Sequence, residues 1–152
     1  MTALQDTVPM GPIVCATRGG EVSRRTQERA IALAREREIP LIFFFVADTR
    51  FARPTNEALS EALGDELARL GRTMLHIART RAREQGISAH AVVRHGTVSE
   101  VMENFLREVD ASLLVVGTPQ ENSGHQSFKP GEISEFAERI RAATGVEVLV
   151  VS

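Results

Sequence analysis

Short apolar runs alternate with helical patterns along this chain, and that alternation limits the fold more than any other feature of the sequence. Residues 41–46 form an apolar run with no polar position, which is typical of a strand buried on both faces of a parallel sheet. Similar runs predict further strands at 13–16, 87–95, 112–117 and 146–151. The helices expected between the strands cover residues 23–39, 56–85, 97–109 and 132–143. The sequence therefore predicts a single-domain α/β fold, an open parallel five-stranded sheet with helices on both faces.

The longest expected helix carries a continuous apolar stripe, which we expect to face the core. Its apolar positions recur every three or four residues and are Leu59, Leu63, Leu67, Leu70, Met74 and Ile77. Gly86 ends this helix after a last turn rich in arginine, which suits the negative end of the helix dipole.

Composition excludes several classes of protein. The chain carries 18 basic and 20 acidic residues, so a polyanion is not the expected main partner, and no nucleic-acid contact is predicted. No apolar run reaches the roughly 20 residues that a membrane span needs. Cys15 is the only cysteine, which excludes an internal disulfide framework and favours a cytoplasmic location. We expect residues 1–11 to form a mobile N-terminal lead-in and residues 12–152 to form the domain.

An unusually long loop is expected over residues 117–131, between the fourth strand and the last helix. Most connections of this kind span roughly 2–6 residues in compact α/β units. A loop at the carboxyl end of a buried strand lies where open α/β sheets bind their ligands. This loop is therefore the first candidate for a binding site.

Three stretches of the chain resemble the universal stress protein family in order and spacing. Residues 13–25 look like that family's first strand, tight turn and helix start, and residues 92–118 look like its most recognisable middle part. Residues 146–151 resemble its terminal strand. The resemblance implies a Rossmann-like sheet of the adenine-nucleotide alpha-hydrolase type, with strand order 3-2-1-4-5. It also implies a ligand crevice between residues 17–20 and the 117–131 loop.

The resemblance further implies which residues line that crevice. Nucleotide-binding members place adenine and ribose near the ends of strands 1 and 2, and their phosphates on a glycine-rich loop that runs into a helix N-terminus. Glycines allow close backbone approach to phosphate oxygens, and the helix end supplies partial positive charge. The candidate cofactor-binding residues of this chain are Thr17, Arg18, Gly19, Val46, Asp48, Gly117, Gln120, Ser127, Lys129, Gly131 and Glu132.

Several of these positions depart from the family's phosphate loop, whose pattern is Gly-x-x-Gly-x9-Gly-Ser/Thr. Gly117 fits the first glycine, but the second falls on Gln120. The third falls on Pro130, which has no N–H, and a shift of one residue restores Gly131 but puts Glu132 at the hydroxyl position. A carboxylate there already satisfies the helix dipole and repels a triphosphate. ATP binding in the usual family manner is therefore not expected.

The charge at the crevice has also changed, and it leaves two interpretations open. Arg18 stands where the family has an acidic residue, and Gly20 stands where it has a serine. Arg18, Lys129 and His125 can supply positive charge for an anion. Further hydrogen-bond donors of the loop are Ser123, Gly124 and Ser127. Alternatively, Arg18 pairs with Glu132 and fills the former phosphate site, which we favour because the two substitutions occur together and have opposite charge.

Other reactive side chains have simpler explanations. His90 and His95 are five residues apart on one expected strand, so they face opposite sides of the sheet and cannot chelate one metal. Cys15 lies among apolar neighbours, where a buried inert thiol is commoner than a nucleophile. Ser123 and His125 could be read as a nucleophile and its base, but the sequence offers no carboxylate at a position that would orient the histidine. No catalytic residue and no metal site is therefore predicted.

Two functional classes remain. The first, which we favour, is a non-enzymatic regulatory or stress-response module that works as a homodimer and through an unidentified protein partner. The second is a sensor or weak ATPase that binds an adenine nucleotide, ATP or AMP, in a remodelled loop. Hydrolysis needs an acid that holds a metal, and Asp48 after the second strand is the only acid that we nominate.

The last strand carries a prediction about assembly. Val146, Val148 and Val150 alternate with Glu147, Leu149 and Val151, so the strand is largely apolar on both faces. An exposed apolar edge invites pairing with another strand. In the family that the chain resembles, this strand commonly builds an antiparallel homodimer, and we expect the same of residues 146–151.

Overall fold

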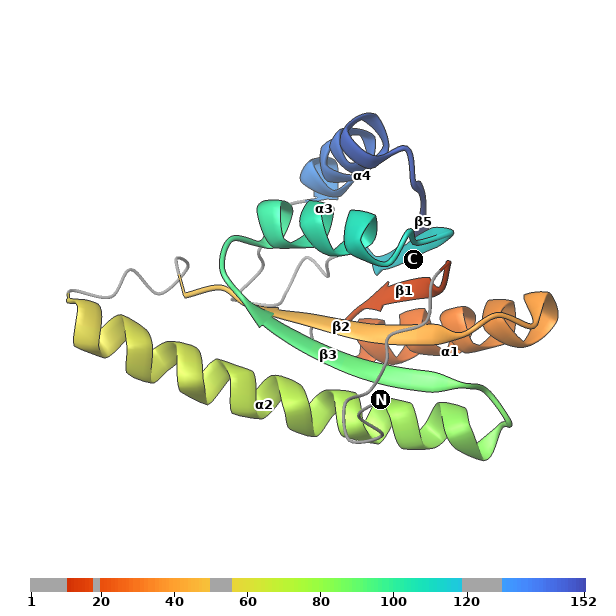
Figure 1. Cartoon of the computed structure of the whole chain (residues 1–152), viewed down its shortest axis with the longest axis horizontal. Helices are drawn as coiled ribbons and strands as arrows, with labels where there is room; N and C mark the ends of the chain where they lie inside the picture. The colour runs from red at the N-terminus through yellow and green to blue at the C-terminus, as the bar shows by residue number, and fades with distance from the viewer. Residues whose placement is uncertain (1–10, 18–19, 50–55, 119–129) are drawn as a thin grey trace.

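The computed structural model of the protein describes residues 11–17, 20–49, 56–118 and 130–152. Figure 1 shows its elements in order: β1 (Ile13–Ala16), α1 (Gly20–Arg37), β2 (Leu41–Ala47), α2 (Glu57–Glu84), β3 (Ala89–His95), α3 (Val98–Glu108), β4 (Leu113–Gly117), α4 (Pro130–Thr144) and β5 (Glu147–Val151). Every expected strand and helix is present. The largest shift is at the start of α1, which begins at Gly20 rather than at Ser23.

Most of the expected N-terminal lead-in, residues 1–10, lies outside the described residues. The next residue is held by the domain, because the backbone N–H of Gly11 donates to the carbonyl of Val109 at 2.8 Å. Within the described residues, no helix is long and apolar enough to cross a membrane.

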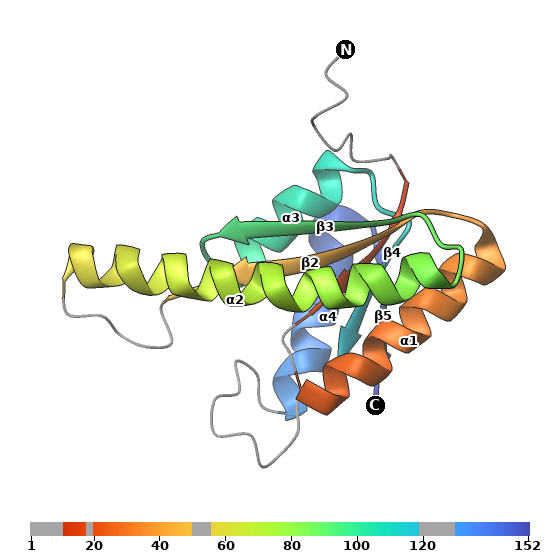
Figure 2. The same cartoon turned by 90° about the horizontal axis from the view of Figure 1, so that it is seen from below.

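All neighbouring strands of the sheet run parallel, in the order β3-β2-β1-β4-β5. This confirms the fold class and the strand order expected from the sequence. Helices α1 and α2 cover one face of the sheet, and α3 and α4 cover the other (Figure 2). The strand order places β1 in the centre, and the chain moves from one side of β1 to the other when it enters β4.

Alternate side chains of the central strands build two separate core layers. Cys15 and Phe43 belong to the layer beneath α1 and α2, whereas Val14 and Phe44 belong to the layer beneath α3 and α4. In the second layer, the ring of Phe44 stacks on the ring of Phe105 with centroids 4.2 Å apart and planes 9° from parallel. Burial on both faces explains why these strands have no polar alternation in the sequence.

The expectation for the core-facing side of α2 was wrong in part. The buried positions form a small-residue face that consists of Gly64, Ala68, Gly71, Leu75, Ala78 and Ala82. Leu67 and Met74 pack only partly against the core, and the side chains of Leu59, Leu70 and Ile77 are 49%, 54% and 54% exposed. Small residues occupy this face because α2 lies very close to the sheet. A Cβ on Gly71 would overlap the ring of Phe45.

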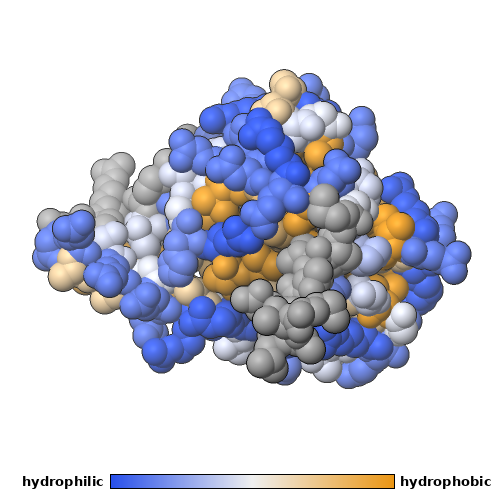
Figure 3. Space-filling model, in the orientation of Figure 1, coloured by the Kyte–Doolittle hydropathy of each residue, from blue (hydrophilic) through white to orange (hydrophobic). Residues whose placement is uncertain are grey.

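Strands β3 and β5 form the two edges of the sheet. Figure 3 shows apolar surface along β3 in the gap between α2 and α3. Val92 and Val93 of this strand are only half-buried, while the guanidinium of Arg94 lies 5.3 Å from the ring centroid of Phe105 and pairs with Glu108 at 3.0 Å. A charged side chain of this kind makes an edge strand less able to pair with another chain.

Candidate functional site

The candidate site lies where the carboxyl ends of β1 and β4 meet. Cys15 pairs with Val115 across these parallel strands, and extending that register by two residues sets Thr17 level with Gly117. The chain reverses its direction across the sheet between β1 and β4, and open α/β sheets bind ligands outside such a point. The structure therefore brings together two of the candidate residues, one from each side of the switch point.

Thr17 is the most distinctive described residue of this crevice. Its backbone N–H donates to the carbonyl of Phe44 at 2.9 Å, which fixes it beside β2. The residue is only 2% exposed, and its hydroxyl oxygen has no hydrogen-bond partner among the described residues. A buried hydroxyl without a partner costs free energy, so the environment of Thr17 suits a polar group that arrives from outside the described residues.

Cys15 lies two residues earlier on the same face of β1 and is fully buried. Burial raises the pKa of this thiol from 9.0 to about 12, against a small lowering by the hydroxyl of Thr17. The hydroxyl of Thr17 therefore lies close to the thiol, although the contact does not have the geometry of a hydrogen bond. A thiol with a raised pKa stays protonated at neutral pH. The expectation that Cys15 is buried is confirmed.

Asp48, nominated as a metal-holding acid, has a structural role in this fold. Its carboxylate oxygen Oδ2 accepts a hydrogen bond from the backbone N–H of Val98 at 3.1 Å, at the first turn of α3. The residue at the N-cap position, Thr97, makes no side-chain capping bond. Sequence reasoning missed this role, because the cap comes from a strand end rather than from the residue before the helix. Val46, the other candidate on β2, is half-buried against the layer of α3 and α4.

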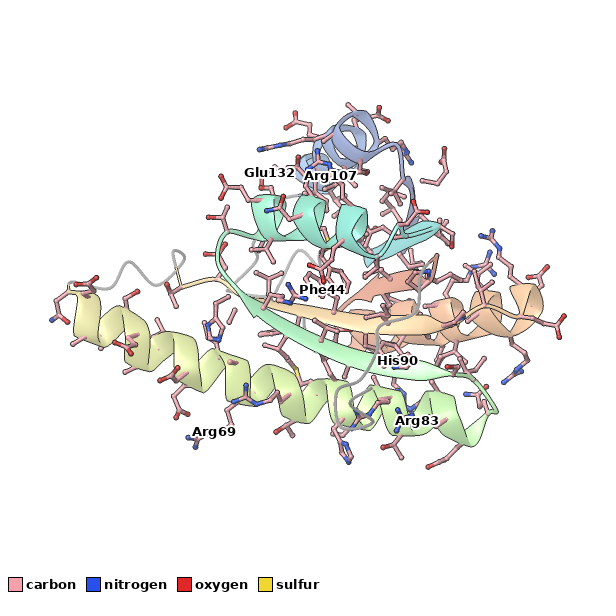
Figure 4. All side chains as sticks on the ribbon, in the orientation of Figure 1. Phe44, Arg69, Arg83, His90, Arg107 and Glu132 are labelled. Atoms are coloured by element: carbon pink, nitrogen blue, oxygen red, sulfur yellow. The ribbon has the colours of Figure 1, made fainter. Side chains whose placement is uncertain are left out.

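The helix after the candidate loop begins earlier than expected. Pro130 and Gly131 already belong to α4, so the loop is shorter at this end than the sequence suggested. Proline is well placed in the first helical turn, where its missing N–H has no helical partner to lose. Glu132 lies exposed in the first turn of α4, and Figure 4 shows it at the helix end. The predicted carboxylate at a helix N-terminus is therefore present.

The remaining candidates, Arg18, Gly19, Gln120, Ser127 and Lys129, lie outside the described residues. The same holds for Ser123, Gly124 and His125, so the predicted ion pair between Arg18 and Glu132 stays a prediction. Among the residues that the structure describes, no group of three histidine, cysteine or acidic side chains is arranged to hold a metal ion.

The expected dimer strand is less available than its sequence suggested. Val146 precedes β5, and both Val146 and Val148 are buried in the chain's own core. The edge of the strand is also partly covered, because the guanidinium of Arg141 donates to the carbonyl of Val148 at 2.8 Å. Glu138 and Glu147 hold Arg141 at 2.8 Å and 3.8 Å.

Comparison with known proteins places this fold and crevice in a family. The model of the universal stress protein family matches residues 10–152. A solved protein of that family from Burkholderia pseudomallei is 25% identical, with 91% of this chain and 94% of that chain covered and a TM-score of 0.69. Universal stress protein UspA from Lactobacillus plantarum is 15% identical, with coverage of 95% and 99% and a TM-score of 0.75.

A third solved structure is named as a complex with a nucleotide. The universal stress protein from Archaeoglobus fulgidus in complex with dAMP is 17% identical, with 96% of this chain and 100% of that chain covered and a TM-score of 0.64. No curated protein sequence matches the chain. Since the family model covers nearly the whole sequence and the solved relatives share its sheet and helices, the chain belongs to the universal stress protein family.

Proposed function

We propose that this protein is a non-enzymatic stress-response module of the cytoplasm that acts as a homodimer and does not bind ATP in the manner usual for its family. The observation that carries the proposal is Glu132 in the first turn of α4. In a phosphate-binding loop, this helix end offers backbone N–H groups and partial positive charge to a phosphate. Here a carboxylate of the chain occupies the same region and repels a polyphosphate.

A second observation supports a non-enzymatic role. Phosphoryl transfer from ATP needs a metal ion next to the phosphates, held by an acidic side chain. Asp48 was the one acid nominated for this task, and its carboxylate caps α3. A metal ion at Asp48 would have to share the carboxylate with this hydrogen bond.

The alternative function is that of an adenine-nucleotide sensor, and one specific observation favours it. The hydroxyl of Thr17 is buried at the switch point with no partner among the described residues. A ribose hydroxyl or an adenine nitrogen is a suitable partner for such a group. The Archaeoglobus fulgidus relative in complex with dAMP supports the same class of ligand.

The two functions differ in what the purified protein contains and binds. We expect denaturing extraction followed by mass spectrometry to release no stoichiometric nucleotide, and calorimetric titration with ATP and AMP to give no heat of binding. The triple variant Arg18→Asp/Gln120→Gly/Glu132→Ser restores the phosphate loop and is expected to gain ATP binding. Sub-micromolar ATP binding by the unaltered protein would contradict the proposal.

AMP binding without ATP binding would favour the sensor. The matched control for that outcome is Thr17→Val, which replaces the hydroxyl by a methyl group of similar size. If the hydroxyl contacts the nucleotide, this variant loses AMP affinity by about tenfold, corresponding to about 1–1.5 kcal/mol for one hydrogen bond. An unchanged affinity would remove Thr17 from the site.

The proposed homodimer uses the edge of β5. Val148 is buried, so the dimer contact rests on the strand's outer backbone groups and on the half-buried Val150. Light scattering at micromolar concentration tests this part of the proposal. A monodisperse monomer would contradict it without bearing on the nucleotide.

A further inference from the structure

Strand β3 forms one edge of the sheet, and half of its backbone groups point away from β2. The N–H of Leu41 donates to the carbonyl of Ser88, and the N–H of Gly96 donates to the carbonyl of Ala47. In a parallel ladder, alternate residues of a strand bond to the neighbouring strand. The even-numbered residues of β3 therefore face β2, and the odd-numbered residues direct their N–H and C=O groups outward.

The outward groups of β3 are only partly used. The carbonyl of Ala89 accepts a hydrogen bond from Nε of Arg83 at 3.1 Å. No hydrogen bond from the described part of the chain reaches the outward N–H and C=O groups of Ala91 and Val93. Val92 and Val93 are half-buried, and apolar surface follows the strand in Figure 3. Open backbone groups beside apolar side chains form a template for a further strand.

One side of α2 flanks this edge with a row of arginines. At about 100° per residue, Arg72, Arg79 and Arg83 lie within about 40° of one another around the helix. Arg83 reaches β3, so this side of the helix is the one that lies along the edge (Figure 4). Arg81 lies on the other side of the helix, where it donates to Gln27 of α1 at 3.4 Å. We call Arg72, Arg79 and Arg83 the arginine row.

The arginine row is level with most of β3. A Cβ on Gly71 would meet the ring of Phe45, and Phe45 pairs with Val93 across the parallel strands. Arg72 therefore lies near the level of Val93, whereas Arg83 contacts the first residue of β3. The outward backbone groups lie between these two levels.

No acidic side chain interrupts the arginine row. Residues 72–83 contain none. Glu61 and Asp65 lie on the same side of α2, but at least about two turns before Arg72. Their neighbour Gly64 is level with His95, so these two acids lie near the end of β3 and not beside its open groups.

The chain itself holds the three arginines to different extents. Arg83 bonds to β3 and so belongs to the fold. Arg79 is half-buried, and its Nη2 lies 3.2 Å from Nδ1 of His76 on the same helix. Arg72 is exposed. Arg72 and Arg79 are therefore the two arginines whose charge a partner can use.

We infer that the outer edge of β3 binds an extended acidic peptide of a partner protein, which joins the sheet as a further strand. The side chains of an added strand alternate between the two faces of the sheet. Those on the α2 face meet the arginine row, where carboxylates are the matching groups. Those on the other face lie beside the half-buried Val92, where apolar side chains are the matching groups.

Charge argues against a second copy of this chain at the same edge. A two-fold axis that pairs β3 with β3 antiparallel keeps both α2 helices on one face of the joined sheet, so the two arginine rows would face each other. Like charges in that position oppose the contact. Arg94, on the other face, discourages ordinary strands as well, although Glu108 balances its charge at 3.0 Å. An acidic strand is the partner for which the arginines are attractive.

The first test uses a capped peptide of alternating glutamate and valine with seven residues, the length of β3. Calorimetric titration into the full chain is expected to show binding that weakens as the salt concentration rises. The same peptide with lysine in place of glutamate is expected to bind at least about tenfold more weakly. No binding of the glutamate peptide, or equal binding of the two peptides, would overturn the inference.

The arginine row is tested by charge reversal. Arg72→Glu/Arg79→Glu is expected to weaken binding of the glutamate peptide by about tenfold or more. The matched control is Arg25→Glu/Arg29→Glu, which makes the same change of net charge at exposed positions of α1. Circular dichroism checks that both variants are folded. Equal affinity of the two variants for the peptide would show that the arginine row does not recognise it.

Amide hydrogen exchange tests whether the peptide joins the sheet. At a saturating concentration of the glutamate peptide, the outward N–H groups of Ala91 and Val93 are expected to exchange about tenfold more slowly or less. The N–H groups of Val92 and Arg94 face β2 and serve as internal controls, with little change expected. Binding without slower exchange at Ala91 and Val93 would place the peptide on the arginines alone, and would overturn the inference.

Discussion

The carboxylate of Asp48 at the end of β2 accepts the backbone N–H of Val98 at 3.1 Å, and so caps a helix that begins fifty residues later in the chain. Thr97, which directly precedes α3, does not supply this bond. The cap ties the end of β2 to the start of α3 next to the candidate crevice. It also engages one carboxylate oxygen of the acidic side chain that the sequence nominated for metal chemistry.

Removing this cap is expected to destabilise the fold. Asp48→Ala leaves the N–H of Val98 without a protein partner and is expected to lower the free energy of unfolding by about 1–2 kcal/mol. Asp48→Asn is the matched control, because its amide oxygen still accepts the bond, and it is expected to lose less than half as much. Urea denaturation measures both values. Equal stability of the alanine variant and the unaltered protein would contradict a capping role.

Two glycines of α2 are expected to respond to alanine with opposite sign. A Cβ on Gly71 overlaps the ring of Phe45, so Gly71→Ala is expected to cost about 1–3 kcal/mol of stability. A Cβ on Gly64 meets only ordinary contacts, with Nδ1 of His95 and Cγ2 of Thr49 both at 3.6 Å. Gly64→Ala is therefore expected to gain about 0.5–1 kcal/mol from helix propensity. Thermal unfolding compares the pair, and destabilisation by both would refute the close approach at Gly71 as the cause.

The α2 helix shows where sequence reasoning reached its limit. The alternation of apolar runs and helical patterns predicted every element, since a strand buried on both faces must be apolar throughout, and the resemblance to the universal stress protein family implied the strand order. It did not predict which side of α2 faces the sheet. Leu59, Leu70 and Ile77 looked like the core because they are large, yet the ring of Phe45 leaves room there only for a residue such as Gly71. Which side of α2 faces the sheet depends on the distance between the helix and the sheet, and the spacing of apolar residues gives no information on that distance.

The crevice was predictable in its position and less so in its chemistry. Thr17 and Gly117 follow the paired ends of β1 and β4 at the switch point, in keeping with the strand order. Glu132 lies in the first turn of its helix, as the helix expected over residues 132–143 implied. The role of Asp48 was not predictable, because the partner of a carboxylate at a strand end is fixed by the packing of a helix fifty residues away.

Cys15 gives the stability of the protein an expected dependence on alkaline pH. Burial raises the pKa of its thiol from 9.0 to about 12. Below pH 9 the folded and unfolded chains both keep the proton, and above it the unfolded chain releases the proton while the folded chain keeps it. The thiol's contribution is therefore lost as pH rises, by about 1.4 kcal/mol per pH unit between the two pKa values. Cys15→Ala lacks this contribution, and urea denaturation of both proteins across that range isolates it. Parallel pH profiles would rule it out.

The outer edge of β5 offers fewer backbone groups than its length suggests. The N–H of Thr118 donates to the carbonyl of Val151 at 2.8 Å. The backbone N–H and C=O groups of Val151 and Leu149 therefore point toward β4, while those of Val148 and Val150 point outward. The outward carbonyl of Val148 already accepts from Arg141 at 2.8 Å. A second copy that pairs with β5 therefore meets the outward N–H and C=O of Val150, whereas the outward C=O of Val148 already accepts a bond from Arg141.

Releasing Val148 is expected to strengthen that pairing. Arg141→Ala frees one acceptor on each strand and is expected to lower the Kd of the dimer about threefold to tenfold, as one further hydrogen bond implies. Val150→Pro removes the outward N–H and blocks the partner strand while it leaves the bonds to β4 intact, so it is expected to raise the Kd. Sedimentation equilibrium measures the Kd of each variant and of the unaltered protein. A Kd that neither variant moves would exclude this edge as the interface.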